Sequence, residues 1–526
     1  MRRRTFLASS TATLALPAVV RADNQRVLKF IALGDLTVVD PVWSAAYITH
    51  YHGYMVFDTL YGQNGQKDGF RCTPQMLAGH TVENDGKTWR LTLREGLLFH
   101  DGEKVLARDC VASIKRWGAR DAFGQALMQR SDEISAPDDK TILFRLKQPF
   151  ALLPDALGHG GVNMCAIMPQ RLAETDPFKQ VTEVVGSGPF RFKADERVQG
   201  SKFVYERFDK YKPRGDGEPS YTAGPKIVHF DRVEWHVLAD AATKAAAMQT
   251  GEMDWWALAA PDLLPMLRRS NITIRPNPAG NLFLLRPNHL YPPFDKPAVR
   301  RALMGAIDQK EFMIAIMGED TSLWSVPCGF FPPVSPLASD AGMSMLVGKP
   351  DYGAVRKALE VAGYQGEKLV LLVPTDDPFG KAACDVAADM LKRVGVNVDY
   401  QATDYGTWVQ RRTLTKPPAE GGWNLIISGW PGLDFLTPAT HLALRGNGKG
   451  AWPGWPDDPK IEALREAWFN APDLAEQKRI AADIQLQAFQ SVPFWPLGLA
   501  QLATAFRHDI TGVLEGFAKF WNVRRT

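Results

Sequence analysis

The chain has 526 residues, of which 45% are hydrophobic and 23% charged, and this profile excludes a disordered chain, a collagen and a coiled coil. At roughly 150 residues per domain, the length predicts two to four domains. The formal charge is +3, but four of the 61 basic residues and no acid lie within residues 1–22. The remaining chain is nearly neutral, so its charge points to neither nucleic acid nor an anionic membrane surface as a partner.

Residues 1–22 are typical of a removed export signal, with a basic start, a weakly apolar middle and small residues before the cleavage point. The run Arg3-Arg4-Thr5-Phe6-Leu7 resembles the twin-arginine signature, and a plain Sec signal is the alternative. No cysteine lies near the cleavage point, so a lipid anchor is not expected. We therefore expect a free protein in the periplasm.

His50 and His52 are one residue apart, and we expect them on one face of a strand, where they could line a pocket or hold a metal ion. No third ligand follows nearby, so a structural role stays open and no metal site is assigned. The five cysteines lack the CxxC and Cys/His spacings of a zinc site. We expect them mainly as buried small apolar residues, with one or two disulfides left open.

Alternating apolar residues between positions 82 and 146 predict antiparallel strands, for example at 89–93 and 142–146. Between these strands, residues 106–117 have the apolar spacing of a helix that packs one face against a core.

Residues 351–430 have a different pattern, in which helices alternate with continuous apolar strands. The predicted elements are a helix capped by Asp351 and ended by Gly363, a strand at 369–373, a helix from Pro378 to Gly395, a strand at 396–400, a helix around Trp408 and a strand at 423–428. This order predicts a mostly parallel sheet with helices on its faces. Asp473 and Glu476 mark the start of a further helix.

Motifs of known catalytic sites are missing from the sequence, which has no HExxH, no GxSxG, no P-loop and no GxGxxG between a strand and a helix. The paired acids beside prolines fit turns and helix caps. We therefore expect no enzyme and no cofactor.

Tryptophan is concentrated near the C-terminus, where eight of the 15 lie between residue 408 and the end. We expect Trp468 and Trp495 to pack in the core. Trp408 and Trp430 lie close to the carboxyl ends of predicted parallel strands, where open α/β sheets bind their ligands. We expect these two rings beside a small solute.

A series of short sequence blocks extends over nearly all of the chain after residue 22. The blocks include Val39-Asp40-Pro41, Phe57-Asp58-Thr59-Leu60-Tyr61, the run from Pro74 to Trp117, Gly186-Ser187-Gly188-Pro189-Phe190, Gly251-Glu252-Met253-Asp254, Pro293-Phe294-Asp295, Val299-Arg300-Arg301-Ala302-Leu303 and Ser428-Gly429-Trp430. In these blocks and in their order, the chain resembles the extracellular solute-binding proteins of family 5, the dipeptide-, oligopeptide- and nickel-binding components of ABC importers.

The resemblance implies an α/β protein with two lobes, the type II or Venus-flytrap arrangement of periplasmic binding proteins, with an extra inserted domain. Lobe 1 would combine a discontinuous domain I (23–52, 185–280 and 496–526) with an inserted α+β domain II (53–184). Lobe 2 would be the α/β domain III (281–495). The chain would cross between lobes near Asn281 and Pro493, which are the expected hinge.

The resemblance also implies ligand-binding residues. Peptide-binding members have an aspartate shortly after the Gly-Trp pair that anchors the peptide's amino group. Here Asp434 follows one residue late, so an anchoring role and a turn or capping role both stay open. Trp430 matches the family directly, and Trp408 corresponds to a tryptophan of the preceding helix. From lobe 1, the expected cleft residues are Trp43, Tyr47, His52 and Trp256.

The function that we expect is a monomeric periplasmic receptor that delivers a small solute, a dipeptide or an amino compound of similar size, to an ABC permease in the inner membrane. The arginines that some oligopeptide binders place before the Gly-Trp pair are replaced by Ile426-Ile427-Ser428, which disfavours a long peptide. Nickel chelates, opines and oligosaccharides remain alternative ligands. A secreted hydrolase is the alternative from another class, because the twin-arginine route often carries enzymes.

Overall fold

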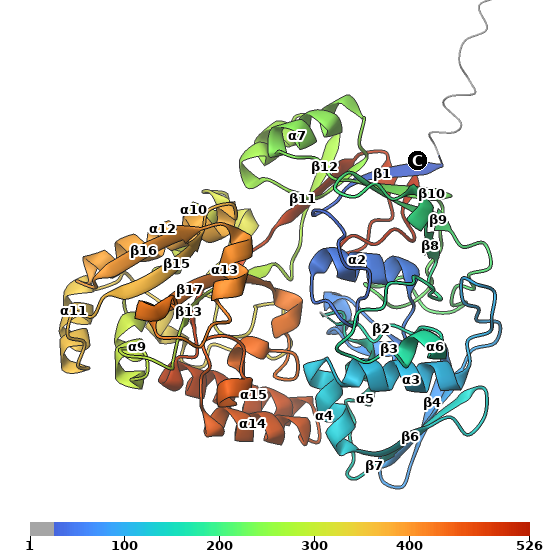
Figure 1. The fold of residues 1–526 in the computed structure, drawn as a ribbon, viewed down its shortest axis with the longest axis horizontal. Coiled ribbons are helices and arrows are strands. Elements are labelled where there is room, and N and C mark those ends of the chain that lie inside the picture. The colour runs from blue at the N-terminus through green and yellow to red at the C-terminus, as the bar shows by residue number, and fades with distance from the viewer. Residues whose placement is uncertain (1–25, 162) are drawn as a thin grey trace, which may run out of the picture.

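The computed structural model describes residues 26–161 and 163–526, which form two lobes side by side (Figure 1). The predicted export signal lies outside these residues. None of the helices in the described part of the chain combines the length and apolarity that a membrane crossing needs.

Domain I of lobe 1 is built on a seven-stranded mixed sheet in the order β12-β19-β11-β1-β10-β9-β8. Its strands are β1 (Val27–Ile31), β8 (Phe190–Phe192), β9 (Lys202–Arg207), β10 (Arg232–His236), β11 (Trp255–Ala259), β12 (Ile272–Pro276) and β19 (Ala503–Arg507). Its helices are α2 (Tyr47–Val56), α7 (Ala241–Thr250) and α8 (Leu264–Arg268), and a short ribbon pairs β20 (Ile510–Thr511) with β21 (Arg524–Arg525). The central strand β1 pairs parallel with β10 along its whole length and with β11 at Phe30 and Ile31.

The inserted domain of lobe 1 confirms the predicted antiparallel strands. Its four-stranded sheet has the order β4-β5-β7-β6, with antiparallel neighbours throughout. The strands are β4 (Leu77–Glu83), β5 (Thr88–Leu93), β6 (Ser131–Ser135) and β7 (Thr141–Leu146), and a separate pair joins β2 (Tyr61–Gln63) to β3 (Cys72–Pro74). The helices are α3 (Ala107–Gly118), α4 (Ala122–Arg130), α5 (Leu153–Gly158) and α6 (Gln170–Ala173).

Lobe 2 is built on a six-stranded sheet in the order β14-β18-β13-β17-β15-β16. Its strands are β13 (Asn281–Pro287), β14 (Trp324–Ser325), β15 (Leu369–Pro374), β16 (Val398–Thr403), β17 (Leu425–Pro431) and β18 (Trp495–Ala500). Its helices are α9 (Pro297–Met304), α10 (Gln309–Met317), α11 (Tyr352–Val361), α12 (Pro378–Arg393), α13 (Tyr405–Arg411), α14 (Pro459–Phe469) and α15 (Leu474–Ser491).

The helix boundaries of lobe 2 follow the predicted caps. Asp351 accepts a hydrogen bond from the Ala354 amide at the start of α11, and Asp473 accepts one from the Glu476 amide at the start of α15. Gly363 and Gly395 have φ of +85° and +79°, a left-handed conformation that ends a helix at low cost for glycine.

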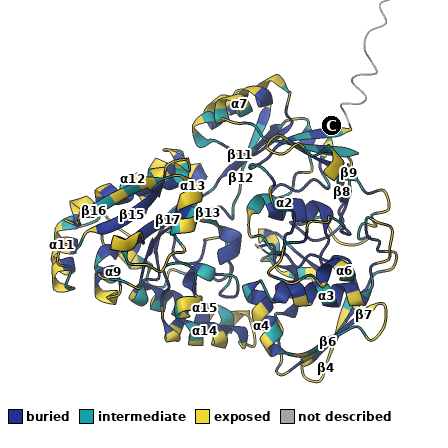
Figure 2. Ribbon diagram, viewed as in Figure 1, coloured by how far each residue is buried: buried dark blue, intermediate teal, exposed yellow. Residues whose placement is uncertain are grey.

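The three strands predicted within residues 351–430 pair parallel with one another, but the complete lobe 2 sheet is mixed and not mostly parallel. β15 pairs parallel with β16 and β17, but β13 pairs antiparallel with β17 and β18, and β14 pairs antiparallel with β18. The parallel part is the β-α-β unit that the sequence predicted, and strands from distant parts of the chain complete the sheet. Both faces of β15 are covered, so all six of its residues are buried and its sequence is apolar without alternation (Figure 2).

The two crossings between lobes lie side by side. The first runs from the end of β12 at Pro276 to the start of β13 at Asn281, and the second from the end of β18 at Ala500 to the start of β19 at Ala503. The Asn277 amide donates a 3.1 Å hydrogen bond to the Leu502 carbonyl, which joins the crossings. Two short, adjacent connections of this kind are the geometry of a hinge.

The position expected for the second crossing, Pro493, is therefore wrong. Pro493 lies inside lobe 2, where its carbonyl accepts a 3.0 Å hydrogen bond from Arg286 Nη1. Residues 496–500 also belong to lobe 2, because β18 pairs with β13 of the lobe 2 sheet. The boundary expected at 52/53 falls within α2, which extends unbroken from Tyr47 to Val56.

Candidate functional site

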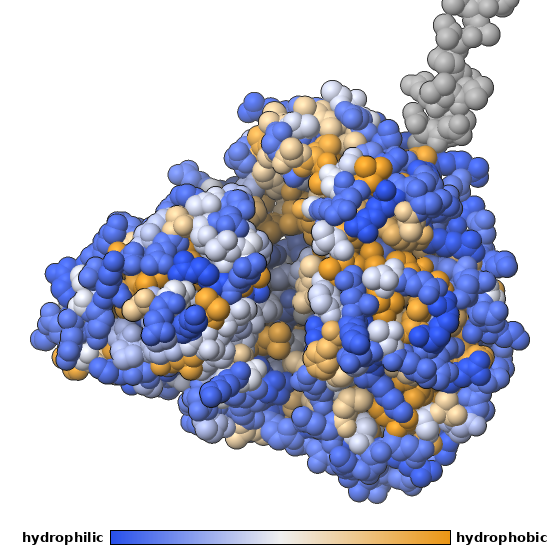
Figure 3. Space-filling view, in the orientation of Figure 1, coloured by the Kyte–Doolittle hydropathy of each residue, from blue (hydrophilic) through white to orange (hydrophobic). Residues whose placement is uncertain are grey.

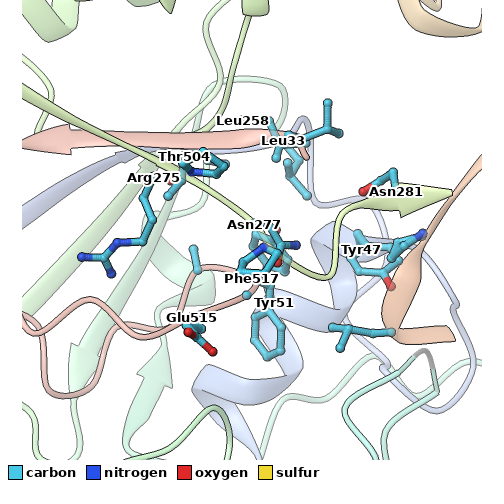
Figure 4. Close-up of a pocket in the computed structure, with 18 of the residues that line it drawn as sticks. Leu33, Tyr47, Tyr51, Leu258, Arg275, Asn277, Asn281, Thr504, Glu515 and Phe517 are labelled. Carbon is cyan, nitrogen blue, oxygen red and sulfur yellow. The ribbon is translucent and has the colours of Figure 1, made fainter. Parts of the chain in front are cut away.

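A cavity of about 310 Å³ lies at the hinge end of the contact between the lobes, and we call it the hinge cavity. Figure 3 shows the furrow that separates the lobes, and Figure 4 shows the cavity with its lining side chains. Lobe 1 contributes Leu33, Tyr47, Tyr51, Leu258 and Phe517, lobe 2 contributes Gly429, Pro431 and Leu433, and the crossings contribute Asn277, Asn281 and Leu502. Because both lobes and the hinge form its walls, the size of this cavity depends on the angle between the lobes.

Tyr47 and Asp434 meet across the cleft beside the hinge cavity. Tyr47 begins α2 of lobe 1, and Asp434 lies in the short helix η7 (Gly432–Phe435) that follows β17 of lobe 2. The Tyr47 hydroxyl donates a 3.2 Å hydrogen bond to Asp434 Oδ2. Burial, and then the Asp434 carboxylate, raise the pKa of Tyr47 well above its usual value, so this hydroxyl stays protonated and remains a donor.

The loop that carries Asp434 is hydrogen-bonded to the first crossing of the hinge. The Gly432 amide donates a 2.8 Å hydrogen bond to the carbonyl of Gly280 in the first crossing. A Cβ on Gly432 would lie 1.9 Å from the Ala279 carbonyl oxygen, so only glycine permits this approach. Movement at the hinge is thereby coupled to the position of Asp434.

Asp434 also faces a basic group of the inserted domain. A Cβ built on Gly161 would lie 2.9 Å from Asp434 Oδ1 and 3.3 Å from His159 Nδ1, which places both side chains against this glycine. Burial alone would lower the pKa of His159, but the carboxylates of Asp121 and Asp434 outweigh it and the pKa is raised. Asp434 therefore contacts domain I through Tyr47 and lies close to the inserted domain at Gly161.

Trp430 lies behind the cavity wall. Its neighbours in β17, Gly429 and Pro431, line the hinge cavity, and side chains alternate along a strand. The Trp430 ring instead stacks on Phe435 at 5.6 Å and meets the Trp452 ring edge-on at 5.2 Å. It is half-buried, so its contact with a solute remains a prediction.

Trp408 is a core residue of lobe 2. It is 1% exposed and packs with Val370, Leu372, Ile426, Trp423 and Trp455 on the face of the sheet opposite α12. Its indole Nε1 donates a 3.3 Å hydrogen bond to the Leu372 carbonyl. With these contacts its ring fills the core, and we propose no solute contact for it.

The other lobe 1 residues expected at the cleft lie away from the hinge cavity. His52 is buried in domain I with its Nδ1 2.9 Å from the Tyr205 hydroxyl, and Trp256 is a buried residue of β11. Trp43 packs toward the inserted domain, where its Nε1 donates a 3.4 Å hydrogen bond to the Phe178 carbonyl. Of the lobe 1 candidates, Tyr47 lines the hinge cavity.

The prediction that His50 and His52 share one face of a strand is wrong. Both belong to helix α2, where residues two apart point in nearly opposite directions. The His50 ring packs against Phe517 at 4.7 Å, and the His52 ring against Phe192 at 5.2 Å. No group of three or more His, Cys, Asp or Glu side chains within 26–161 and 163–526 is arranged to hold a metal ion. The five cysteines are free thiols, and Cys72 alone among them is not fully buried.

Two parts of the hinge cavity were not predicted. The residues of the first crossing include the dense turn signals Pro276, Pro278 and Gly280, which could have indicated a connection. The segment 514–518 lines the cavity with Leu514, Glu515, Gly516, Phe517 and Ala518, and nothing in its sequence marks it. Glu515 and Arg275 are the charged residues that line this cavity.

Comparisons with known proteins agree with this architecture. A solved periplasmic binding protein, AgaA from A. tumefaciens R10 in complex with agropinic acid, is 20% identical, with a TM-score of 0.75 over 95% of this chain and 99% of that one. A dipeptide-binding protein from Pseudoalteromonas sp. SM9913 in complex with Met-Leu is 18% identical, with a TM-score of 0.77 over 95% of this chain and all of that one. The fold is thus that of the two-lobe periplasmic binding proteins.

The sequence comparisons define the family. The profile of the bacterial extracellular solute-binding proteins, family 5, matches residues 71–451. A "Probable peptide ABC transporter periplasmic-binding protein y4tO" of Sinorhizobium fredii is 35% identical over all of this chain and 99% of its own length. The chain belongs to the bacterial extracellular solute-binding proteins of family 5.

Proposed function

We propose that this protein is the periplasmic receptor of an ABC importer and that it binds a dipeptide, or an amino compound of similar size, between its lobes. The observation that carries the proposal is the hinge cavity, which both lobes and both crossings enclose. Its volume of about 310 Å³ is at the lower end of the ~300–1,000 Å³ found for small-molecule sites. A cavity of this size fits a small solute.

The relatives support the ligand class. The Sinorhizobium fredii relative is named for peptide transport, and the solved neighbours hold a Met-Leu dipeptide and agropinic acid. All of these ligands belong to the classes that the resemblance implied. The receptor works as a monomer without catalysing a reaction, and an inner-membrane permease takes the solute from it.

Asp434 lies beside the hinge cavity and lines a neighbouring cavity between the inserted domain and lobe 2, and it is the proposed partner of the solute's ammonium group. It is 2% exposed, and an ammonium group buried in a closed cleft needs an anionic partner because an unpaired buried charge costs several kcal/mol, roughly 3–5. Tyr47 holds one oxygen of this carboxylate in place. Charge at Asp434 therefore selects for cationic or zwitterionic solutes.

Isothermal titration of the mature protein with a panel of dipeptides tests this function. Asp434→Asn keeps the shape and an acceptor for Tyr47 but removes the charge, so binding should weaken by about 2–5 kcal/mol, while the melting temperature changes little. The matched control, Glu420→Gln, removes an exposed acid of the same lobe and should bind normally. Equal binding by Asp434→Asn and the unmodified protein would contradict the anchor, and cleavage of the peptide during the titration would contradict the receptor function.

A further inference from the structure

Asp434 shares a cavity with His159 and Asp121. This cavity, of about 360 Å³, is the one between the inserted domain and lobe 2, and we call it the polar cavity. The inserted domain contributes Asp121 and His159, and lobe 2 contributes Asp434. Ionisable side chains from both lobes therefore line one small space.

The His159 ring lies between the two acids. Its Nε2 is 3.4 Å from Asp121 Oδ1, which also accepts hydrogen bonds from the amides of Phe123 and Gly124 at the start of α4. The ring's Nδ1 lies against Gly161, where a Cβ would be 3.3 Å from Nδ1 and 2.9 Å from Asp434 Oδ1. A single methyl group at this glycine would thus touch both side chains. The imidazole is close enough to each acid for their charges to interact strongly.

The charges around His159 favour its imidazolium form. Burial lowers the pKa of His159, but the carboxylates of Asp121, Asp434 and Asp155 outweigh burial, and the pKa is raised. His50 of α2 is a neighbouring imidazole, and burial, followed by the charge of His159, lowers its pKa to about 3, so it is neutral near pH 7.

Other charged groups face His159 from the walls of the polar cavity and of a larger adjoining cavity that it also lines. They are Arg120, Asp121, Asp434 and Arg445 in the polar cavity, and Lys67, Asp68, Arg71 and Asp155 in the adjoining one. Arg445 is paired with Glu462. Asp155 titrates in the same range as His159, since burial raises its pKa to about 6.

We propose that His159 and the solute's ammonium group compete for Asp434, so that the solute displaces a proton from His159 when it binds. The proposal rests on the proposed function, in which Asp434 anchors an ammonium group. A second cation beside Asp434 neutralises this carboxylate and repels the imidazolium across a poorly hydrated space, and both effects favour the neutral imidazole. One positive charge replaces another at the acid, and the proton passes to the solvent. Binding therefore weakens as the pH falls.

Isothermal titration of the mature protein in buffers of different ionisation enthalpy counts the released protons. The probe is the dipeptide of the panel that binds best, at pH 6.5, where a peptide's amino group with a pKa near ~8 is charged. We expect release of a fraction of a proton per peptide, and an affinity that falls between pH 7 and 5.5 by up to about tenfold per pH unit.

His159→Gln should remove this release and most of the pH dependence of the affinity. His229→Gln, at an exposed position of domain I outside both cavities, is the matched control and should keep both. Proton uptake by the unmodified protein, or a release that persists in His159→Gln, would overturn the proposal.

Nuclear magnetic resonance tests the coupling of the two side chains without solute. The ring signals of His159 report its pKa in the unmodified protein and in Asp434→Asn. Asp434→Asn removes a carboxylate that stabilises the imidazolium, so the pKa of His159 should fall, whereas Glu420→Gln, at an exposed position of lobe 2, should leave it unchanged. An unchanged pKa in Asp434→Asn would overturn the proposal whatever the titrations give, and this test does not require His159→Gln to fold.

The two experiments separate this proposal from the proposed function. If peptides bind without releasing a proton, the receptor function stands and the competition is overturned. If no dipeptide binds the unmodified protein at any pH, the peptide receptor function fails, and displacement of the proton by a peptide fails with it. The resonance titration then still decides whether His159 and Asp434 are coupled across the cleft.

Discussion

A buried ion pair joins domain I to the inserted domain in lobe 1. Arg116 of α3 and Asp40 of domain I form an ion pair that is 1% and 0% exposed, with Nη2 2.6 Å from Oδ2. Asp40 also accepts hydrogen bonds from the amides of Val42, Trp43 and Val181. The Val39-Asp40-Pro41 block therefore has a structural role at the boundary with the inserted domain.

Arg116→Ala should destabilise the protein by about 3–5 kcal/mol, because Asp40 would stay buried without its cation. Urea unfolding followed by circular dichroism measures this loss. Arg171→Ala breaks an ion pair with Glu183 in which both side chains are about half exposed, and it should cost less than ~1 kcal/mol. Similar losses for the two variants would contradict the role of burial.

Buried neutral histidines should lower the free energy of unfolding as the pH falls below neutral. Burial, and then Arg197, lower the pKa of His52 to about 3, whereas an unfolded histidine titrates near ~6.5. Below pH ~6.5 the unfolded chain therefore binds a proton that the folded protein does not, and each such histidine removes about 1.4 kcal/mol of stability per pH unit down to its folded pKa. Asp155, whose pKa burial raises to about 6, acts in the opposite direction.

Unfolding free energies at several pH values between 7 and 4.5 test this dependence. His52→Gln should give a slope smaller by about 1.4 kcal/mol per pH unit, and the contribution of Asp155 cancels in the comparison. Gln410→Ala, at an exposed position without an ionisable group, should leave the slope unchanged. Parallel slopes for all three proteins would rule out the effect.

At the scale of elements, helix α4 of the inserted domain and helix α14 of lobe 2 close the rim of the cleft opposite the hinge (Figure 1). Phe469 of α14 packs against Phe123 at 5.8 Å and Phe150 at 6.1 Å. The Arg130 guanidinium lies 4.7 Å from the centre of the Phe469 ring and pairs with Glu466. These contacts join the lobes independently of the hinge.

Phe469→Ala should shift the lobes toward an open form, because it removes the apolar centre of this contact. We expect a larger radius of gyration without ligand and about tenfold weaker solute binding, since only the closed fraction binds tightly. Phe178→Ala, at an exposed site of the inserted domain, is the control. An unchanged radius and affinity in Phe469→Ala would show that the contact does not set the equilibrium.

At the scale of the whole molecule, two crossings that are hydrogen-bonded to each other allow the lobes to rotate as rigid bodies. A micromolar solute binds with about 8 kcal/mol, which is enough to move a population from open to closed if its contacts form in the closed form alone. Small-angle scattering should therefore show a smaller radius of gyration at saturation with the solute. A constant radius would count against closure by this hinge.

The local sequence was enough to predict those helix ends and strands that depend on residues close together in the chain. The caps at Asp351 and Asp473 and the glycine ends at Gly363 and Gly395 were predictable, because a cap is a contact within four residues. The antiparallel strands of the inserted domain follow from alternation in the same way. The family resemblance added the two lobes, which no local pattern contains.

Tertiary structure alone decided which of the expected site residues come together. Tyr47 and Asp434 are 387 positions apart and meet because the lobes fold against each other. Trp408 has the sequence position of a ligand-binding ring, but Trp423 and Trp455 cover it within the core. The second crossing follows β18 and not Pro493, because β18 pairs with β13, more than 200 residues earlier in the chain. Strand pairing, the burial of an aromatic ring and the contact between the lobes all join residues that are far apart in the chain. Their energies depend on surfaces that only the folded chain brings together.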